Sequence, residues 1–226
     1  MADDRRRVRT IHRRLLRHFG TLEPPRRSDP LDELILTVLS QHTSDANADR
    51  AFHALRARFP SWEDVVRARA TSVADAIRSG GLANTKAPRI QAVLREIHDR
   101  EGAFDLSGLR RLRDAEVVRY LTSLPGVGPK TAAVVLAFSL GRAAIPVDTH
   151  VHRVATRLGL VGPRASAERA HRLLEALVPA ELRVQLHVGL IRLGRETCKA
   201  GRPRCERCPL VALCPTAPSF LGSPLP

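Results

Sequence analysis

The chain has 226 residues, 43% of them hydrophobic, and a formal net charge of +14 at neutral pH. This length and apolar content allow one large domain or two small ones with a proper core. No run of 18 apolar residues occurs and the N-terminus lacks an apolar signal core, so neither a membrane span nor a secretory signal is expected. We therefore expect a cytoplasmic protein, associated with the nucleoid if it is bacterial.

The excess positive charge lies at the two ends of the chain. Residues 1–28 carry nine arginines against three acidic residues, whereas residues 29–141 are nearly balanced and residues 142–226 are again basic. An Arg-rich surface without a ligand could account for this balance. Nucleic acid is the preferred partner, because the release of counterions favours binding of such a surface to a polyanion.

Apolar residues recur at helical spacing through most of the sequence. Residues 5–19 predict a helix whose apolar face holds Ile11, Leu15, Leu16 and Phe19. Residues 20–28 are expected to form a linker, after which Ser28 or Asp29 caps a helix with a proline in its first turn. The apolar positions of that helix are Leu31, Leu34, Ile35, Val38 and Leu39.

The rest of the chain continues the helical pattern. A turn at residues 41–44 precedes a helix through Ala51 and Leu55, and Ser61 with Asp64 resembles a capping box. Further helices are expected at residues 73–77, 86–100, 114–123, 129–140, 149–158, 166–177 and 180–195. No segment alternates apolar and polar residues convincingly, so the sequence predicts an all-α fold without a sheet. Residues 215–226 contain four prolines and are expected to be a loose tail.

Residues 124–130 read Leu-Pro-Gly-Val-Gly-Pro-Lys. Gly126 and Gly128 permit positive φ and close backbone approach, and Pro129 suits the first position of a helix. The exposed N–H groups at such a helix start favour an anion such as a phosphate. A nucleotide-binding P-loop does not fit, because Pro129 separates the glycine from the lysine. An ordinary corner between two helices is the structural alternative.

Lys130 is one of only three lysines among 37 cationic residues, the others being Lys86 and Lys199. Arginine stays protonated and cannot act as an amine nucleophile. The positive end of the helix dipole disfavours an ammonium at Lys130 and lowers its pKa, and a neutral amine can form an imine with a sugar aldehyde carbon. A simple phosphate contact is the alternative role for this lysine.

Asp148 follows the hairpin within the segment Val-Asp-Thr-His and precedes a predicted helix. Its simplest role is to cap that helix. A capping carboxylate stays ionised, so it can also stabilise cationic character at an anomeric carbon. The two roles are compatible.

The four cysteines Cys198, Cys205, Cys208 and Cys214 are separated by six, two and five residues. This compressed spacing suits a four-thiolate iron–sulfur cluster, while zinc remains open because one Cys-x-x-Cys knuckle is present. The loop between the first two cysteines carries three positive charges and is a candidate phosphate contact, although it could also be merely solvated. Its basic residues are Lys199, Arg202 and Arg204.

Taken in order, the hairpin with its lysine, the Val-Asp-Thr-His segment and the four-cysteine pattern resemble the endonuclease III family of DNA glycosylases. The similarity runs from about residue 29 to residue 214. It implies two helical domains flanking a DNA-binding cleft: a six-helix barrel with a helix–hairpin–helix over residues 29–141, and an iron–sulfur domain over residues 1–28 and 142–226. It also implies a [4Fe–4S] cluster held by the four cysteines.

The resemblance further implies that a monomer acts on double-stranded DNA with damaged pyrimidines or abasic sites. Lys130 would be the Schiff-base nucleophile and Asp148 its activating carboxylate, acting on a flipped nucleotide before β-elimination. Leu82 matches the family's intercalating leucine, although it could instead be a leucine packed beneath a loop. Either Gln41 or His42 would face the orphaned base, with Gln41 preferred.

The chain departs from the family pattern at three points. Residues 40–45 differ from the usual Ser-Ala-Gln-Ala-Thr-Asp, Ala83 replaces a frequent aromatic, and Pro129 replaces a frequent arginine. These changes bear on lesion preference and on reading of the opposite base. The alternatives to a bifunctional enzyme are a monofunctional mismatch or damage glycosylase, whose relatives lack a lysine at position 130, and a non-enzymatic cluster-containing DNA-binding protein.

Overall fold

The computed structural model describes residues 2–24 and 28–222. Within these ranges all regular elements are helical and no strand occurs, which confirms the predicted all-α class. The chain forms two compact units: a middle unit, Arg27–Arg142, and a terminal unit, Met1–Arg26 with Ala143–Pro226. No helix in the described part of the chain is both long and apolar enough to span a bilayer.

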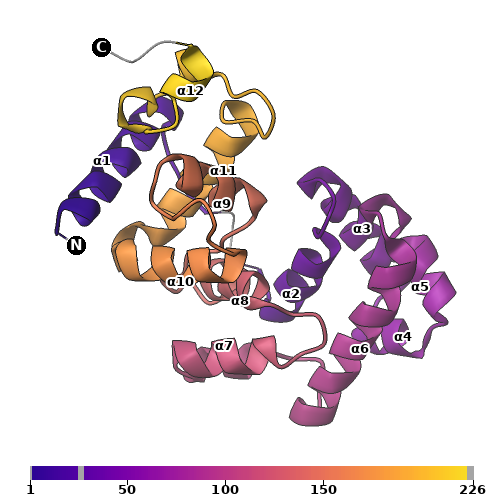
Figure 1. Ribbon diagram of the computed structural model, residues 1–226. Coiled ribbons are helices and arrows are strands. Elements are labelled where there is room, and N and C mark those ends of the chain that lie inside the picture. The colour runs from indigo at the N-terminus through magenta and orange to yellow at the C-terminus, as the bar shows by residue number, and fades with distance from the viewer. Residues whose placement is uncertain (1, 25–27, 223–226) are drawn as a thin grey trace. The chain divides into compact units, whose positions relative to one another are not determined.

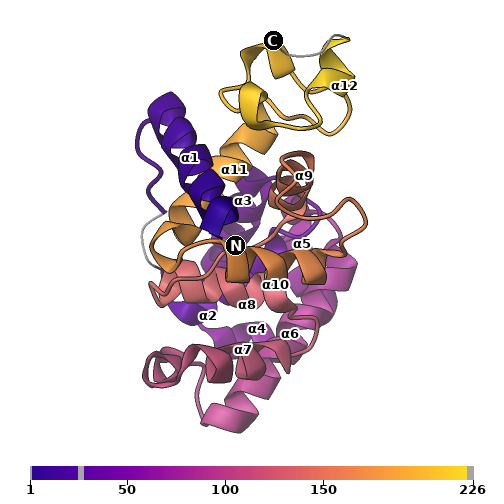
Figure 2. The same ribbon diagram turned by 60° about the vertical axis from the view of Figure 1, so that its left-hand side comes forward.

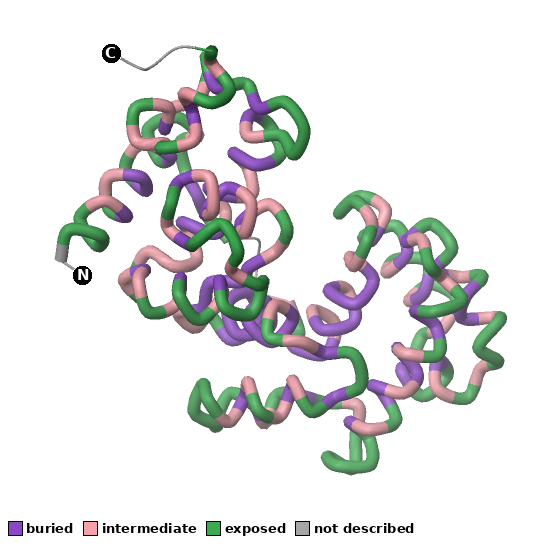
Figure 3. Tube along the Cα trace, viewed as in Figure 1, coloured by how far each residue is buried: buried purple, intermediate pink, exposed green. Residues whose placement is uncertain are grey.

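The middle unit is built around one buried helix, α2 (Pro30–Leu39), which contacts α3, α6 and α8 (Figure 1). Most of its residues are buried, as the trace in Figure 3 shows. The other helices of this unit are α3 (Asp45–Arg58), α4 (Trp62–Arg67), α5 (Ala70–Ala76), α6 (Ala83–Glu101), α7 (Asp114–Thr122) and α8 (Pro129–Val134), with 3-10 turns at Arg78–Gly80 and Ser107–Arg111.

Two helix starts in the middle unit follow directly from their capping residues. The Asp29 carboxylate accepts hydrogen bonds from the amides of Leu31 and Asp32, so Asp29 rather than Ser28 caps α2. At α4, Ser61 and Asp64 form the predicted capping box. Each cap satisfies amide groups that the first helical turn leaves without partners.

The helix predicted for residues 129–140 is not α-helical throughout. It is α-helical as α8, and then widens into a π-helical turn, Val135–Ser139. The Leu140 amide donates to the Val135 carbonyl at 3.0 Å, five residues back. All five residues of the turn are buried. Such a change of helical register leaves no mark in hydrophobic spacing, because every residue in the segment faces protein.

The terminal unit packs α11 (Arg183–Glu196) against α1 (Ala2–Phe19) and α9 (Thr149–Arg157), as Figure 2 shows. The remaining helices are α10 (Ala167–Leu177) and α12 (Pro218–Leu221), with 3-10 turns at Ala180–Leu182, Cys205–Arg207 and Val211–Leu213. Its hydrophobic core combines residues from α1 with residues from the second half of the chain.

The buried face of α1 differs from the predicted one only at Leu16. Val8, Ile11 and Leu15 are fully buried, whereas Leu16 is 39% exposed. A stripe at positions 8, 11 and 15 turns the next residue away from the core, because each helical residue rotates by about 100°. The predicted linker over residues 20–28 lies partly outside the described residues; residues 20–24 have no regular structure.

The predicted loose tail is in part ordered. Helix α12 occupies Pro218–Leu221, and Ala217 before it is buried. The Arg157 guanidinium lies over the Phe220 ring, 5.0 Å from its centroid. Residues 223–226 lie outside the described part. The prediction of a loose tail is therefore wrong for residues 217–221, because packing against α9 holds a segment that has little helical preference of its own.

Candidate functional site

The hairpin between α7 and α8 has the sharp turn that its sequence predicts. Gly126 has φ +71°, in the region that favours glycine. Gly128 instead caps α8 in an extended conformation, with φ −104°, so the positive φ expected as possible at this position is not used. Pro129 is the first residue of α8, as predicted.

The two glycines of the hairpin should respond differently to substitution. A Cβ added at Gly126 would lie 2.7 Å from both Cδ and Nε of Arg89, while a Cβ at Gly128 would meet nothing within 4 Å. We expect Gly126→Ala to lower the free energy of unfolding by about 1–2 kcal/mol, because it combines a left-handed backbone with a displaced side chain. Gly128→Ala is the matched control and should change it by less than about 0.5 kcal/mol in denaturant titrations. Equal effects would contradict this account.

Lys130 is the second residue of α8 and is half-buried. An acidic residue not singled out in the sequence, Glu33 of α2, lies within electrostatic reach of it. Burial raises the pKa of the Glu33 carboxyl, while a hydrogen bond from Ser28 and the positive charge of Lys130 act in the opposite direction. Glu33 lies in the first turn of α2, where acidic residues are common, so no signal in the sequence distinguished it.

The scarcity of lysine does not by itself single out Lys130. Lys86, at the start of α6, is only 2% exposed. Its ammonium donates hydrogen bonds to the carbonyls of Leu39, at 2.6 Å, and Gly80, at 2.8 Å. Burial lowers the pKa of Lys86. Its two bonds join the end of α2 to the loop that carries Leu82, so this lysine has a structural role.

Two candidate DNA-contact residues have strained backbones. Leu82 has φ 49° and His42 has φ 55°, and they are the only non-glycine residues with positive φ in residues 2–24 and 28–222. Leu82 is 57% exposed, so it does not pack beneath a loop. His42 is also exposed, whereas the neighbouring Gln41 is half-buried. Strain of this kind costs about 1–3 kcal/mol per residue and tends to occur at functional sites.

Asp148 in the terminal unit caps α9, as its sequence context predicts. Its Oδ1 accepts a hydrogen bond from the Val151 amide at 2.7 Å, and the side chain is half-buried. The segment before it is fixed by His187, whose Nδ1 lies 2.7 Å from the Pro146 carbonyl oxygen. The carboxylate is thus held at a helix start, where the dipole stabilises its negative charge.

The four cysteines line one pocket of the terminal unit. Cys205 is buried and the other three are half-buried, and none forms a disulfide. Burial raises the pKa of the Cys208 thiol to about 11, so its thiolate would need a bound cationic centre. Among the described residues, no three His, Cys, Asp or Glu side chains are arranged to hold a single metal ion.

The segment that carries the cysteines is anchored to α9 by arginines. Arg157 donates to Cys198 Sγ at 3.2 Å and to the carbonyls of Lys199 and Ala200 at 2.6 and 2.8 Å. Arg153 donates to the carbonyl of Cys198 at 3.1 Å. The sequence identified the cysteines but not these arginines, because their partners lie more than 40 residues away in the chain.

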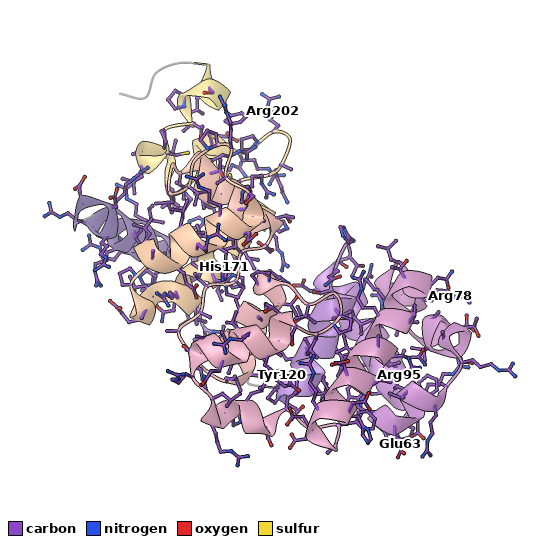
Figure 4. All side chains as sticks on the ribbon, turned by 60° about the horizontal axis from the view of Figure 1, so that its bottom comes forward. Glu63, Arg78, Arg95, Tyr120, His171 and Arg202 are labelled. Atoms are coloured by element: carbon purple, nitrogen blue, oxygen red, sulfur yellow. The ribbon has the colours of Figure 1, made fainter. Side chains whose placement is uncertain are left out.

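The basic loop between the first two cysteines is exposed. Lys199, Arg202 and Arg204 all reach the surface of the terminal unit, and Arg202 is labelled on this loop in Figure 4. The Lys199 ammonium donates to the Arg195 carbonyl at the end of α11. Three exposed cations on a loop fixed by Arg157 make a suitable surface for DNA phosphates.

Comparisons with known proteins agree with this set of features. Residues 35–180 match the HhH-GPD superfamily of base excision DNA repair proteins. Endonuclease III of Thermotoga maritima is 34% identical over 181 residues, which cover 80% of each chain. Endonuclease III of Bacillus subtilis is 36% identical over 187 residues, which cover 83% of this chain and 81% of that protein.

Solved structures show the same likeness in three dimensions. A trapped covalent intermediate of endonuclease III with DNA has a TM-score of 0.84 and 30% identity, covering 96% of this chain and 98% of that one. A thermostable thymine-DNA glycosylase, with a TM-score of 0.78 and 22% identity, shares the fold. With its hairpin, its helix-capping Asp148 and its cysteine pattern, the chain belongs to the endonuclease III family within the HhH-GPD superfamily of base excision DNA repair proteins.

Proposed function

We propose that this protein is a bifunctional DNA glycosylase and abasic-site lyase that removes oxidised pyrimidines from double-stranded DNA during base-excision repair. The position of Lys130 carries the proposal. This lysine begins a helix after the Gly126 turn, in a chain that matches an endonuclease III captured in a covalent complex with DNA. A covalent sugar complex needs a nucleophile, and an amine can form an imine. Of the other two lysines, Lys86 is buried and Lys199 lies in the cysteine segment.

The proposed reaction uses Lys130 and Asp148 on one flipped nucleotide. The neutral amine of Lys130 bonds to C1′ while the bond from C1′ to the base breaks, and the bonding electrons leave with the base. The Asp148 carboxylate stabilises the positive charge that develops at C1′. The amine nitrogen then loses a proton, the bond from C1′ to O4′ breaks and O4′ takes up a proton, so the sugar opens to a protonated imine. A base takes a proton from C2′, a double bond forms between C2′ and C3′, and the bond from C3′ to the phosphate oxygen breaks with its electrons leaving on the phosphate.

We also propose that the middle unit is the six-helix barrel domain and that the terminal unit holds a [4Fe–4S] cluster. The four cysteines line one pocket and are separated by only six, two and five residues, and this compressed spacing suits a four-thiolate iron–sulfur cluster. The cluster would join the cysteines into one unit and so fix the loop of Lys199, Arg202 and Arg204 for phosphate contact. Leu82 and one residue of the 41–44 turn would fill the space left by the flipped nucleotide.

The cluster assignment predicts the behaviour of Cys208→Ser. This variant should lose iron and brown colour and give less folded protein, because the thiolates hold the last part of the chain together. Val211 lines the same pocket but has no sulfur, so Val211→Ala is the control variant and should keep its iron. Metal analysis and yield measure the outcome. A colourless wild type with one zinc per chain would refute the cluster, and a folded Cys208→Ser variant with selective loss of catalysis would refute its structural role.

A panel of duplexes, each with one lesion, tests the proposed function itself. Wild-type protein should release an oxidised pyrimidine and also cut the strand at neutral pH without added alkali. Base release that leaves the strand intact would instead indicate a monofunctional glycosylase. Binding of the duplexes without base release or strand cleavage would indicate a non-enzymatic DNA-binding protein. Gel filtration of the free protein tests the expected monomer.

A further inference from the structure

Helix α6 connects three turns of the middle unit that carry candidate DNA contacts. Lys86 joins the end of α2 to the loop before Leu82 by its bonds to the carbonyls of Leu39 and Gly80. Arg89, three residues along the helix, donates from Nη1 to the Gln41 side-chain oxygen at 3.0 Å. Residues at this spacing lie on the same face of a helix. This face of α6 therefore contacts the 41–44 turn through the hydrogen bond from Arg89 to Gln41.

Arg89 also contacts the hairpin. A Cβ built at Gly126 would lie 2.7 Å from Arg89 Cδ and Nε and 3.2 Å from Cζ, so the arginine stem packs directly against the glycine backbone. The φ of +71° favours glycine at position 126, and any larger residue there would also displace the Arg89 side chain. One side chain thus spans the 41–44 turn and the hairpin that leads to Lys130.

The hydrogen bond from Arg89 makes Gln41 less available than His42 for contact with DNA. The side-chain oxygen of Gln41 is bound to a guanidinium and the residue is half-buried. His42 is exposed and has the left-handed backbone that only Leu82 shares among the described non-glycine residues. A strained backbone persists only where its surroundings hold it. The hydrogen bond from Arg89 holds Gln41, the residue immediately before the strained His42.

We infer that Arg89 is a positioning residue that decides which side chain of the 41–44 turn enters DNA: it keeps Gln41 in the protein and leaves His42 to face the orphaned base. This inference rests on the proposed glycosylase function. An imidazole offers one donor and one acceptor, or two donors when protonated, whereas a carboxamide offers both groups in a different geometry. Arg89 therefore influences the preference for the opposite base without touching DNA.

The test places fluorescent 2-aminopurine opposite a stable tetrahydrofuran abasic analogue in a duplex. Wild-type protein should change the fluorescence by inserting a side chain beside that base. His42→Ala and Arg89→Met should each remove most of the fluorescence change at saturating protein, because each variant leaves the orphaned base without the inserted imidazole. Arg95→Met is the matched control, because Arg95 is exposed on the same helix (Figure 4) and has only a 3.4 Å contact with the Val66 carbonyl. It should behave as wild type.

Two further variants separate positioning from general stability. Gln41→Met removes the other partner of the hydrogen bond, so the double variant with Arg89→Met should be no worse than either single variant. Gly126→Ala keeps the arginine but displaces its stem, and it should reproduce the loss seen with Arg89→Met. Unfolding midpoints of all variants show whether each protein is folded when the fluorescence is measured.

The outcomes distinguish this inference from the proposed function. Failure of wild-type protein to form a borohydride-stable adduct with abasic DNA would refute the function. If wild type forms the adduct but folded Arg89→Met keeps the full fluorescence change, only the role of Arg89 is refuted. The same conclusion follows if Gln41→Met abolishes the signal while His42→Ala retains it, because Gln41 would then be the inserted residue.

Discussion

Lys130→Gln is expected to abolish the covalent adduct that wild-type protein forms with abasic DNA under borohydride reduction. The amide nitrogen of glutamine is not basic and cannot form an imine, so no reducible intermediate arises. Strand cleavage should fall by at least about a thousandfold, the scale seen when a nucleophile is removed from an enzyme. Denaturing gels that resolve the protein–DNA adduct measure the first effect, and cleavage of an abasic duplex measures the second.

The chain offers a natural control for this experiment, since it has only three lysines. Lys199→Gln removes an exposed amine of the cysteine segment and should weaken DNA binding while leaving the adduct intact. Adduct formation by Lys130→Gln at the wild-type yield would place the nucleophile elsewhere, and peptide mapping would locate it. Unfolding midpoints of both variants show whether each protein is folded when the adduct is measured.

Asp148→Asn should slow release of a damaged base by about a hundredfold with little change in stability. Asparagine caps a helix about as well as aspartate, so the hydrogen bond to the Val151 amide can persist. The substitution removes the negative charge that would stabilise the developing cation at C1′, and loss of one such preorganised group commonly costs a factor of about 10²–10³. Single-turnover base release with an oxidised pyrimidine duplex measures this step.

Two comparisons separate the charge of Asp148 from its capping role. Asp148→Ala removes both, so it should lose about 1 kcal/mol of stability in addition to the slower base release. Ser166→Ala removes only the cap of α10 and should slow nothing. If Asp148→Asn released base at the wild-type rate, the carboxylate would be a cap alone. Asp148→Asn should have a smaller effect on the yield of adducts with preformed abasic sites, because those sites have already lost the base.

Much of the helical framework could be predicted from local signals. The caps at Asp29, Ser61 and Asp148 and the Gly126 turn all appear where the sequence places them. Each of these features depends on residues within about four positions of one another, so local sequence is sufficient. Hydrophobic spacing likewise located the long helices, although it gave the wrong face at Leu16.

Features that depend on distant partners could not be predicted. Lys86 is one of only three lysines, and its burial and two carbonyl partners, which give it a structural role, were not visible in the sequence. The order at Phe220 depends on Arg157, which is far away in the chain. The hydrogen bond from Arg89 to Gln41 joins residues 48 positions apart, so no local pattern indicates it.

By itself, the sequence determined the class of fold, the family and the residues proposed for chemistry: Lys130, Asp148 and the four cysteines. Short motifs were sufficient because the chemical capacity of an amine, a carboxylate or a thiol is a property of the residue. The tertiary structure alone decided that α8 widens into a π-helical turn, that Glu33 lies within electrostatic reach of Lys130, and that Arg89 holds Gln41. The physical reason is that packing between helices decides which side chains come into contact, and the local sequence pattern does not specify contacts between distant residues.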